Sequence, residues 1–375
     1  MHKLNRHLWY ILLLVGIAVL LFLTSPQPTK IVQSMAETLH QKKTMIDEEN
    51  SNNKSAKTPS KKLRSNILVM AGARTGSSFV GEFFETNPEI FYLFEPLQGF
   101  KKYTFQREMS TGGIELLAQI YRCDFANEYL REYFRWKKST RGCPKLNATI
   151  AAHCCREANH TATKVIRNID IRDFIPLMQD PGIDLKVINI VRDPRAMMSS
   201  LIRLHKSMWK DNNEWTNVIL RENDLDEQMK SVLIHYCDHS LRNFLLKSAD
   251  GIFSPWRKNL LILRFENIAL APKTYARVIY DFLDIKLHND TLDWIDEHTQ
   301  AKPMQAQEAN TNRSYQSSNF SLLRNAIEVV TQWRKKVTFD LVKAIQSEKV
   351  CRKYMQAFNY TLIQNEENLT HGDLF

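Results

Sequence analysis

Residues 70–97 read MAGARTGSSFVGEFFETNPEIFYLFEPL, a stretch that predicts a strand, a tight turn and a helix in succession. The apolar run at 67–70 is typical of a buried strand in a parallel sheet. Gly76 allows the backbone to approach a ligand closely, and the first turn of the helix offers unpaired N–H groups at the positive end of its dipole. Arg74 adds a full positive charge, so the turn predicts an anion-binding loop.

The loop is not a Walker loop, because G-x-x-x-x-G-K-[ST] requires a lysine after its second glycine and Gly76 is followed by Ser77. This disfavours an ordinary nucleotide kinase. A serine-capped turn without a ligand is the alternative when the loop is taken alone. The residues that we expect to hold an anion are Arg74, Thr75, Gly76, Ser77, Ser78, Phe79 and Val80.

A second anion site is predicted at 185–200, which reads LKVINIVRDPRAMMSS. Arg192 follows an apolar strand, and Asp193-Pro194 begins a helix with an acidic cap and a proline in its first turn. Arg192 and Ser200 can then converge on one phosphate, although a surface pair of Arg192 with Asp193 is the alternative. Ligands of open α/β sheets collect at the carboxyl ends of strands, so the two sites together predict a nucleotide with phosphates at both ends.

With these motifs the chain resembles the membrane-bound carbohydrate 6-O-sulfotransferases, and most of all the branch that contains chondroitin 6-sulfotransferase and keratan sulfate galactose 6-sulfotransferase. The resemblance covers roughly residues 66–360. Further matches are LRFENIA at 263–269, DWIDEHTQA at 293–301 and C-x-x-x-M-x-x-x-x-Y from Cys351 to Tyr360. The resemblance implies a P-loop-like sulfotransferase fold and transfer of sulfate to a sugar 6-hydroxyl.

The resemblance also implies the donor, 3'-phosphoadenylyl sulfate (PAPS), as co-substrate. The loop at 74–80 corresponds to the family's 5'-phosphosulfate loop, and the stretch at 192–200 to its 3'-phosphate site. The family's C-terminal segment has a serine where this chain has Ala326, and Asn359 replaces a usual glycine. The residues implied for the 3' side and the C-terminal segment are Arg192, Asp193, Pro194, Arg195, Ser199, Ser200 and Arg324.

Glu95 is the predicted general base. It lies in the apolar stretch 91–96, whose side chains would desolvate its carboxylate. By analogy with phosphoryl transfer, sulfuryl transfer needs in-line positioning, stabilised equatorial oxygens and a base for the incoming hydroxyl. Arg74 is the second catalytic candidate, because it can stabilise charge on the leaving group. The alternative for Glu95 is a carboxylate that only orients Arg74 or a sugar hydroxyl.

The N-terminal region predicts a membrane anchor followed by a stem. Residues 8–24 are largely apolar and follow basic residues, so the positive-inside rule predicts that 1–7 form a cytosolic tail and the remainder enters the lumen. A cleaved signal peptide is the alternative. Residues 25–65 are polar and poor in aromatic residues, which predicts a disordered lumenal stem. The resemblance implies a single-pass type II protein of the Golgi membrane.

Residues 66–375 predict one sulfotransferase catalytic domain. Apolar runs alternate with helical stretches, which predicts an α/β fold with a central parallel sheet and helices on both faces. The strands that we name from the sequence lie near 66–71, 163–167, 185–191 and 260–265.

Cysteines and sequons fit a lumenal protein. Eight N-x-[ST] sequons occur, at Asn53, Asn147, Asn159, Asn289, Asn312, Asn319, Asn359 and Asn368. The six cysteines are even in number and free to pair in the lumen, but their connectivity cannot be read. The His and Cys clusters at 153–160 and 235–239 contain no paired C-x-x-C spacing of the kind found in zinc sites, so we expect no metal.

The formal net charge of +10 over 375 residues points to anionic partners. No nucleic-acid-binding module is visible, so an acidic glycosaminoglycan or glycoprotein glycan and a doubly phosphorylated nucleotide are the expected partners. GalNAc of chondroitin is the first acceptor, with galactose of keratan sulfate or a GlcNAc as the alternative. A catalytically silent glycan-binding relative is the alternative of another class, and a homodimer is an open alternative for the assembly.

Overall fold

The computed structural model describes residues 64–98, 111–137, 139–166, 170–209, 227–248, 254–299 and 326–371. The predicted cytosolic tail and anchor, the predicted stem up to residue 63, and Arg324 lie outside these ranges. Within the described ranges, no helix combines the length and apolar character that a membrane crossing requires.

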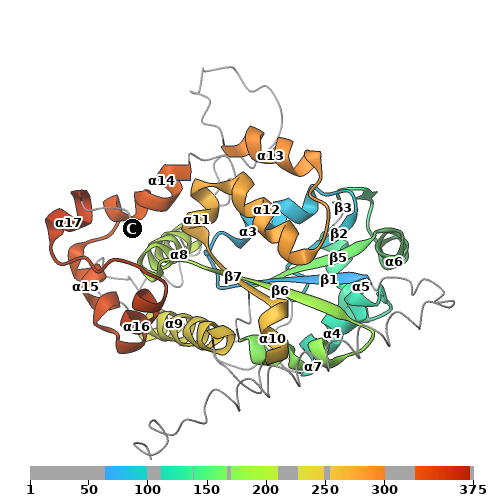
Figure 1. The fold of residues 1–375 in the computed structure, drawn as a ribbon, viewed down its shortest axis with the longest axis horizontal. Helices are drawn as coiled ribbons and strands as arrows, with labels where there is room; N and C mark the ends of the chain where they lie inside the picture. Colours follow the sequence, from blue (N-terminus) through green and yellow to red (C-terminus); the bar gives the residue numbers. More distant parts are fainter. Residues whose placement is uncertain are drawn as a thin grey trace, which may run out of the picture. The chain divides into compact units, whose positions relative to one another are not determined.

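The centre of the described unit is a five-stranded parallel sheet with the strand order β2-β5-β1-β6-β7 (Figure 1). Its strands are β1 (Ser65–Ala71), β2 (Ile90–Phe94), β5 (His160–Val165), β6 (Asp184–Val191) and β7 (Leu260–Arg264). This confirms the predicted α/β fold. Four strands lie close to the predicted positions, whereas β2 was treated only as the apolar setting of Glu95.

Helices cover both faces of the sheet, as predicted. In the first half of the chain they are α3 (Ser77–Glu85), α4 (Thr111–Tyr121), α5 (Glu128–Trp136), α6 (Ala148–Glu157), η1 (Ile171–Phe174), α7 (Ile175–Gln179) and α8 (Pro194–Trp209), with a small hairpin of β3 (Ser139–Thr140) and β4 (Cys143–Pro144). In the second half they are α9 (Glu227–Ser248), α10 (Ser254–Asn259), α11 (Phe265–Leu270), α12 (Pro272–Leu283), α13 (Asn289–Thr299), α14 (Ala326–Thr331), η2 (Gln332–Lys335), α15 (Phe339–Ser347), α16 (Lys349–Ala357) and α17 (Glu366–His371).

Strand β1 shows why the sheet is buried on both sides. Ile67 and Val69 pack into the same core as residues of α3 and α12, whereas Leu68 and Met70 pack with residues of α4 and α5. All four side chains are fully buried. Figure 1 shows α3 and α12 on one side of the sheet and α4 and α7 on the other. The continuous apolar run is therefore that of a central strand covered by helices on both faces.

The C-terminal helices form a third core beside the carboxyl end of β6. Helix α16 packs along α9, and the Cys237–Cys351 disulfide links these two helices. In Figure 1 the red C-terminal helices gather beside α8 and α9. The last part of the chain thereby packs next to the second predicted anion site.

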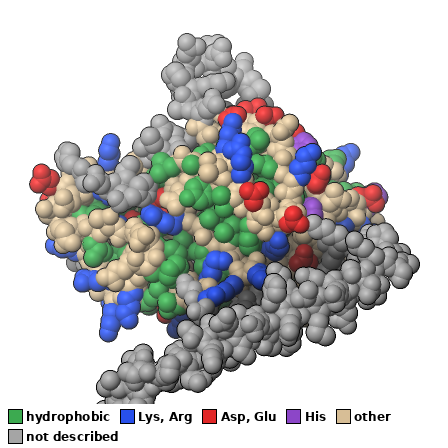
Figure 2. All heavy atoms as spheres, viewed as in Figure 1, with side chains coloured by type: hydrophobic (Ala, Val, Ile, Leu, Met, Phe, Trp, Pro, Cys, Tyr) green, Lys and Arg blue, Asp and Glu red, His purple; other side chains and the backbone are tan. Residues whose placement is uncertain are grey.

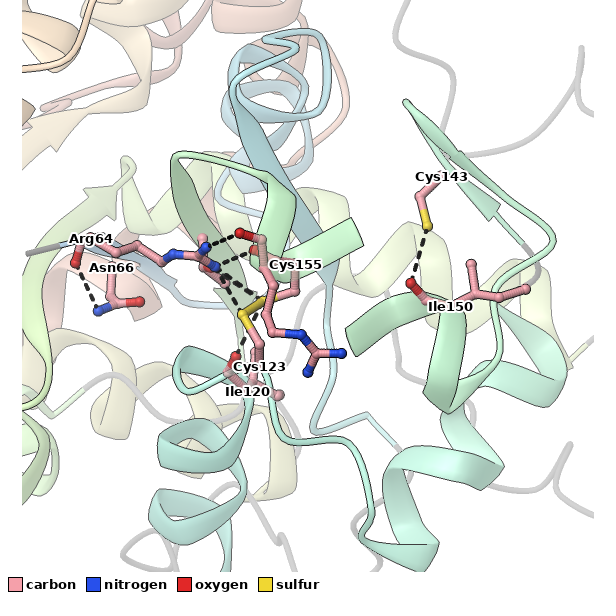
Figure 3. Close-up of a disulfide and its surroundings, with 9 residues drawn as sticks. Arg64, Asn66, Ile120, Cys123, Cys143, Ile150 and Cys155 are labelled. Atoms are coloured by element: carbon pink, nitrogen blue, oxygen red, sulfur yellow. Dashed lines mark hydrogen bonds between the residues drawn. A yellow bond between two sulfur atoms is a disulfide. The ribbon is translucent and has the colours of Figure 1, made fainter. Parts of the chain in front are cut away.

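All six cysteines are paired, as Cys123–Cys155, Cys143–Cys154 and Cys237–Cys351. The adjacent residues Cys154 and Cys155 belong to two different disulfides, so neither is a free thiolate for a metal. Figure 3 shows the guanidinium group of Arg64 beside the Cys123–Cys155 bond, where it also donates to the carbonyl of Arg156 at 2.7 Å. The hydrogen bonds of Arg64 to Cys155 and Arg156 tie the residue before β1 to α6.

Charged side chains on one face of the molecule are dispersed rather than concentrated. On the face shown in Figure 2, Lys and Arg side chains occur at several separate places, with acidic side chains among them.

The sequon asparagines that fall within the described ranges are all exposed: Asn147, Asn159, Asn289, Asn359 and Asn368.

Candidate active site

The first anion loop has a backbone that only glycine permits at its centre. Gly76 has φ 83°, and a Cβ atom placed there would lie 2.1 Å from the ring of Phe265. The loop is tied by the hydroxyl of Thr75, which donates to the carbonyl of Gly72 at 2.8 Å. Helix α3 begins at the next residue, Ser77. The sequence folds into this turn because Gly76 accepts both the left-handed conformation and the packed ring.

The start of α3 presents free donors to the loop. Gly76 is the N-cap residue, and no side chain among the described residues caps the helix. The N–H groups of Phe79 and Val80 bond back to the carbonyl of Gly76, which leaves those of Ser77 and Ser78 directed out of the helix end. Together with the helix dipole they form a site for an anion.

The two predicted anion sites meet through Arg74. Its Nε donates to the hydroxyl of Ser200 at 3.0 Å, although the two residues are 126 positions apart. The guanidinium group of Arg192 donates to the carbonyl of Arg74 at 2.9 Å. The structure therefore brings Arg74, Arg192 and Ser200 together at the carboxyl edge of the sheet.

Arg192 is held by aromatic residues from distant elements. Its guanidinium group lies 4.9 Å from the centroid of the Phe265 ring, and burial lowers the pKa of Arg192 while Glu266 opposes that shift. Its backbone carbonyl accepts bonds from the hydroxyls of Tyr236, at 3.0 Å, and Tyr354, at 2.8 Å. A buried cation of this kind favours binding of an anionic ligand, because the ligand replaces the electrostatic stabilisation that water would give.

Asp193 and Arg195 connect the start of α8 to the C-terminal segment. Asp193 accepts a bond from the backbone N–H of Arg195 at 2.8 Å and pairs with its guanidinium group at 2.7 Å. Arg195 is buried and also donates to Gln346 and to the carbonyl of Thr361. Pro194 is the first residue of α8. The structure thus gives Asp193 and Arg195 partners within the protein.

Ser199 and Ser200 lie side by side on α8, and both are buried. Of these two serines, Ser200 accepts a hydrogen bond from the first loop, from the Nε of Arg74. Arg324, the remaining residue predicted for the donor, falls outside the described residues.

Glu95 lies directly after β2 with φ 47°, and it is 9% exposed. Its Oε1 is 2.7 Å from the Nζ of Lys164, whose side chain is 1% exposed. The same Nζ donates to the hydroxyl of Ser78 at 3.0 Å and lies 3.8 Å from the centroid of the Phe94 ring. Burial lowers the pKa of Lys164, and the neighbouring Glu95 opposes that shift. One cation therefore links the predicted base to the predicted anion loop.

Lys164 is a candidate site residue that the sequence patterns did not indicate. It was included in a predicted strand at 163–167 but was given no role. A lysine is almost never fully buried unless it is paired, so a lysine within a predicted buried strand was the available signal. Its partner could not be read, because the contact requires β2 to lie beside β5 with Phe94 opposite Lys164.

A second carboxylate, Glu82, lies on α3 one turn after Ser78. Burial raises the pKa of Glu82 to about 7, with a further contribution from Glu85, while Lys137 and Lys164 lower it. Glu82 therefore interacts electrostatically with Lys164, and its carboxyl group can gain or lose a proton near neutral pH.

The motif at 263–269 contacts the second predicted anion site from the protein interior. Glu266 is buried and accepts bonds from the backbone N–H of Asp193, at 2.9 Å, and from the hydroxyl of Tyr360, at 2.8 Å. Burial raises the pKa of Glu266, and the negative charge of Asp193 raises it further by a smaller amount. Glu266 and Tyr360 belong to two of the family-like motifs. They therefore form one hydrogen-bond network with Asp193, the residue after Arg192.

The arrangement combines three cations and a helix N-terminus with the carboxylate of Glu95 at a single edge of the sheet. Arg74, Arg192 and Lys164 can bind a ligand that carries two anionic groups, and Glu95 can accept a proton from a hydroxyl close to one of them. Among the residues that the structure describes, no group of three or more His, Cys, Asp or Glu side chains could hold a metal ion.

Comparison with known proteins agrees with this chemistry. Residues 64–359 match the family model described as the sulfotransferase domain. Carbohydrate sulfotransferase 3 of Mus musculus is 31% identical over 83% of this chain and 71% of its own length. Carbohydrate sulfotransferase 1 of Danio rerio is 28% identical over 82% of this chain and 80% of its own length.

Solved structures give a more distant likeness. The crystal structure of retinol dehydratase in a complex with retinol and PAP aligns with a TM-score of 0.42 and 16% identity, covering 78% of this chain and 82% of that one. The family match over most of the chain, and a relative above 30% identity, are the findings that assign the protein. The chain therefore belongs to the sulfotransferase family, with carbohydrate sulfotransferases among its relatives, and it is a sulfotransferase enzyme.

Proposed function

We propose that the protein transfers sulfate from PAPS to the 6-hydroxyl of a sugar in a glycosaminoglycan or related glycan. GalNAc of chondroitin is the acceptor that we place first, with galactose of keratan sulfate or GlcNAc as the alternative. The observation that carries the proposal is the contact of Lys164 with both Ser78 and Glu95. It sets a carboxylate base beside an anion-binding loop, as transfer from an anionic donor to a hydroxyl requires.

The donor would be held at its two charged ends. The N–H groups of Ser77 and Ser78 and the side chain of Arg74 are suited to the 5'-phosphosulfate, because they combine a helix N-terminus with a full charge. Arg192 and Ser200 are suited to the 3'-phosphate. The bonds that join Arg74 to Ser200 and to Arg192 couple the two ends of this donor site.

The transfer step follows from the position of Glu95. Glu95 takes the proton of the sugar 6-hydroxyl as the hydroxyl oxygen bonds to sulfur, and the bond between sulfur and the 5'-phosphate oxygen breaks. Lys164 stabilises negative charge on the transferring group, since its Nζ already contacts Ser78 on the donor side. Before the reaction, the ion pair with Lys164 holds the carboxylate of Glu95 beside the anion-binding loop.

The test is incubation of the purified protein with labelled PAPS and a panel of desulfated chondroitin, desulfated keratan and GlcNAc-terminated acceptors. We expect label on the 6-position of one acceptor class, with chondroitin GalNAc labelled fastest. Binding of the glycans without transfer of label to any of them would favour the catalytically silent glycan-binding relative.

We also propose a membrane topology. Residues 8–24 would anchor the protein in the Golgi membrane as a single-pass type II protein, and 25–65 would separate the catalytic domain from the bilayer. The exposed sequon asparagines and the oxidised cysteines support a lumenal catalytic domain. In intact microsomes the C-terminus should resist protease until detergent is added. Cleavage without detergent would contradict this topology.

A further inference from the structure

A pocket of about 830 Å³ lies apart from the active site, between α5, α6 and the turn that precedes α5. None of Arg74, Glu95, Lys164 and Arg192 lines it. Its lining includes Asp124, Phe125, Arg131, Phe134, Arg135 and Arg156. A space of this volume is within the range of small-molecule and oligosaccharide-sized sites.

The pocket lining has an excess of positive charge. Arg131, Arg135 and Arg156 are exposed, and in the part of the chain that the structure describes neither Arg131 nor Arg156 forms an ion pair. Arg135 pairs with Glu132 at 2.7 Å, but both side chains are mostly exposed, so the pair is weak. The single acidic lining residue, Asp124, accepts a bond from the backbone N–H of Ala126.

Covalent bonds hold the walls of the pocket in place. Cys123 lines the pocket and is bonded to Cys155 of α6, and the Cys143–Cys154 disulfide ties β4 to the same helix. Figure 3 shows both regions, with Arg64 beside the first disulfide. The buried rings of Phe125 and Phe134 pack edge to face, with centroids 5.4 Å apart. The arginines therefore project from a preformed frame, which lowers the entropic cost of binding.

Helix α5 connects the pocket to the active site. Arg131 and Arg135 are four residues apart and share one face of this helix. Near its end, the hydroxyl of Tyr133 donates to the carbonyl of Phe94 at 2.7 Å, next to Glu95. Tyr133 lies on the opposite face of α5 from Arg131 and Arg135, so a ligand that contacts both the pocket and Glu95 must pass around this helix, which a polymer can do and a single sugar cannot.

We propose that the pocket binds a sulfated or carboxylated stretch of the same glycan chain whose acceptor sugar is presented to Glu95. Arginine suits this ligand because its planar group forms paired bonds with sulfate and carboxylate oxygens. The proposal rests on the proposed function and adds to it a second binding site for the acceptor chain, at a distance from the sugar that reacts.

The test compares two double variants. Arg131→Ala with Arg156→Ala removes two pocket charges, and Arg277→Ala with Lys353→Ala removes two exposed charges from α12 and α16. We expect the pocket variant to bind end-biotinylated chondroitin sulfate at least fivefold more weakly and to raise the KM for that polymer similarly. Its KM for a neutral disaccharide acceptor should be unchanged, and the control variant should resemble the unaltered protein.

Equal binding of the polymer by the pocket variant and the unaltered protein would overturn the proposal. An equal loss in both double variants would do the same, since it would indicate a general effect of net charge. The binding measurement does not depend on turnover. If the unaltered protein transferred no sulfate, the proposed function would fail, and polymer binding would still decide whether the pocket recognises an anionic chain.

Discussion

The donor side and the base side of the active site are assembled in different ways. Arg74, Ser77 and Ser78 come from one short loop, and this loop depends on its own turn and on the start of α3. Glu95 and Lys164 come from different strands and meet because β2 pairs with β5 in one register. A side chain of the loop can therefore be changed at the cost of binding, whereas a change in the buried pair also affects the fold.

The largest effect is expected for Glu95→Gln on the base side. If Glu95 removes the proton of the sugar hydroxyl, kcat should fall by roughly 10²-fold to 10⁴-fold, the usual contribution of general-base catalysis. Affinity for 3'-phosphoadenosine 5'-phosphate should be preserved, because the donor loops are not altered. Steady-state kinetics and calorimetry measure the two quantities. A raised acceptor KM with nearly normal kcat would instead assign Glu95 an orienting role.

Lys164→Met should show that the base side is also part of the fold. The change leaves the carboxylate of Glu95 buried without its partner, which typically costs about 3–5 kcal/mol. Urea denaturation measures the loss. The double variant of Lys164→Met with Glu95→Gln is the control, and it should recover much of the stability since no buried charge is left unpaired. A double variant as unstable as Lys164→Met alone would show that the ion pair is not the cause.

Arg192→Ala should affect the donor side by weakening the binding of the donor nucleotide. A charged hydrogen bond contributes about 1.5–3 kcal/mol, so the Kd of 3'-phosphoadenosine 5'-phosphate should rise tenfold or more. Ser200→Ala should produce a smaller increase, because it removes a neutral hydroxyl that bonds Arg74. Calorimetry checks both variants. Unchanged binding by Arg192→Ala would exclude Arg192 from the 3'-phosphate site.

The smallest effect is expected for Glu82→Gln, and it depends on pH. Burial raises the pKa of Glu82 from an ordinary value of 4.5 to about 7, so the folded protein holds this proton more tightly than the unfolded chain. Glu82 therefore makes stability fall as pH rises from 4.5 through 7. Relative to the unaltered protein, the variant should gain about 1 kcal/mol between pH 5 and pH 8, a figure reduced for partial exposure. Urea denaturation at the two pH values should reveal it, and parallel pH dependences would contradict the assignment.

The contrast between the two sides also explains what the sequence could predict. The loop around Gly76 and the strand end at Arg192 are local patterns of glycine, proline and apolar residues, and they predicted the strands, the helix starts and their meeting at one edge of the sheet. Strand β2 was missed because its five residues form a short apolar run, which periodicity does not distinguish from other buried segments. Lys164 and the disulfide pairings depend on which segments lie side by side, and spacing along one chain does not contain that information.

The bonds behind Arg192 have a consequence for the synthesis of the protein. Tyr354 bonds the carbonyl of Arg192 across 162 positions, and Tyr360 bonds Glu266 across 94. At ordinary rates of translation, the ribosome makes Tyr354 roughly 10 to 30 seconds after Arg192. A nascent chain therefore carries both donor loops well before it carries the tyrosines that fix one of them. A premature stop codon just before Tyr354 would leave every proposed donor-contacting residue in the chain and still impair the site, so the enzyme should become able to bind its donor only when its synthesis is almost complete.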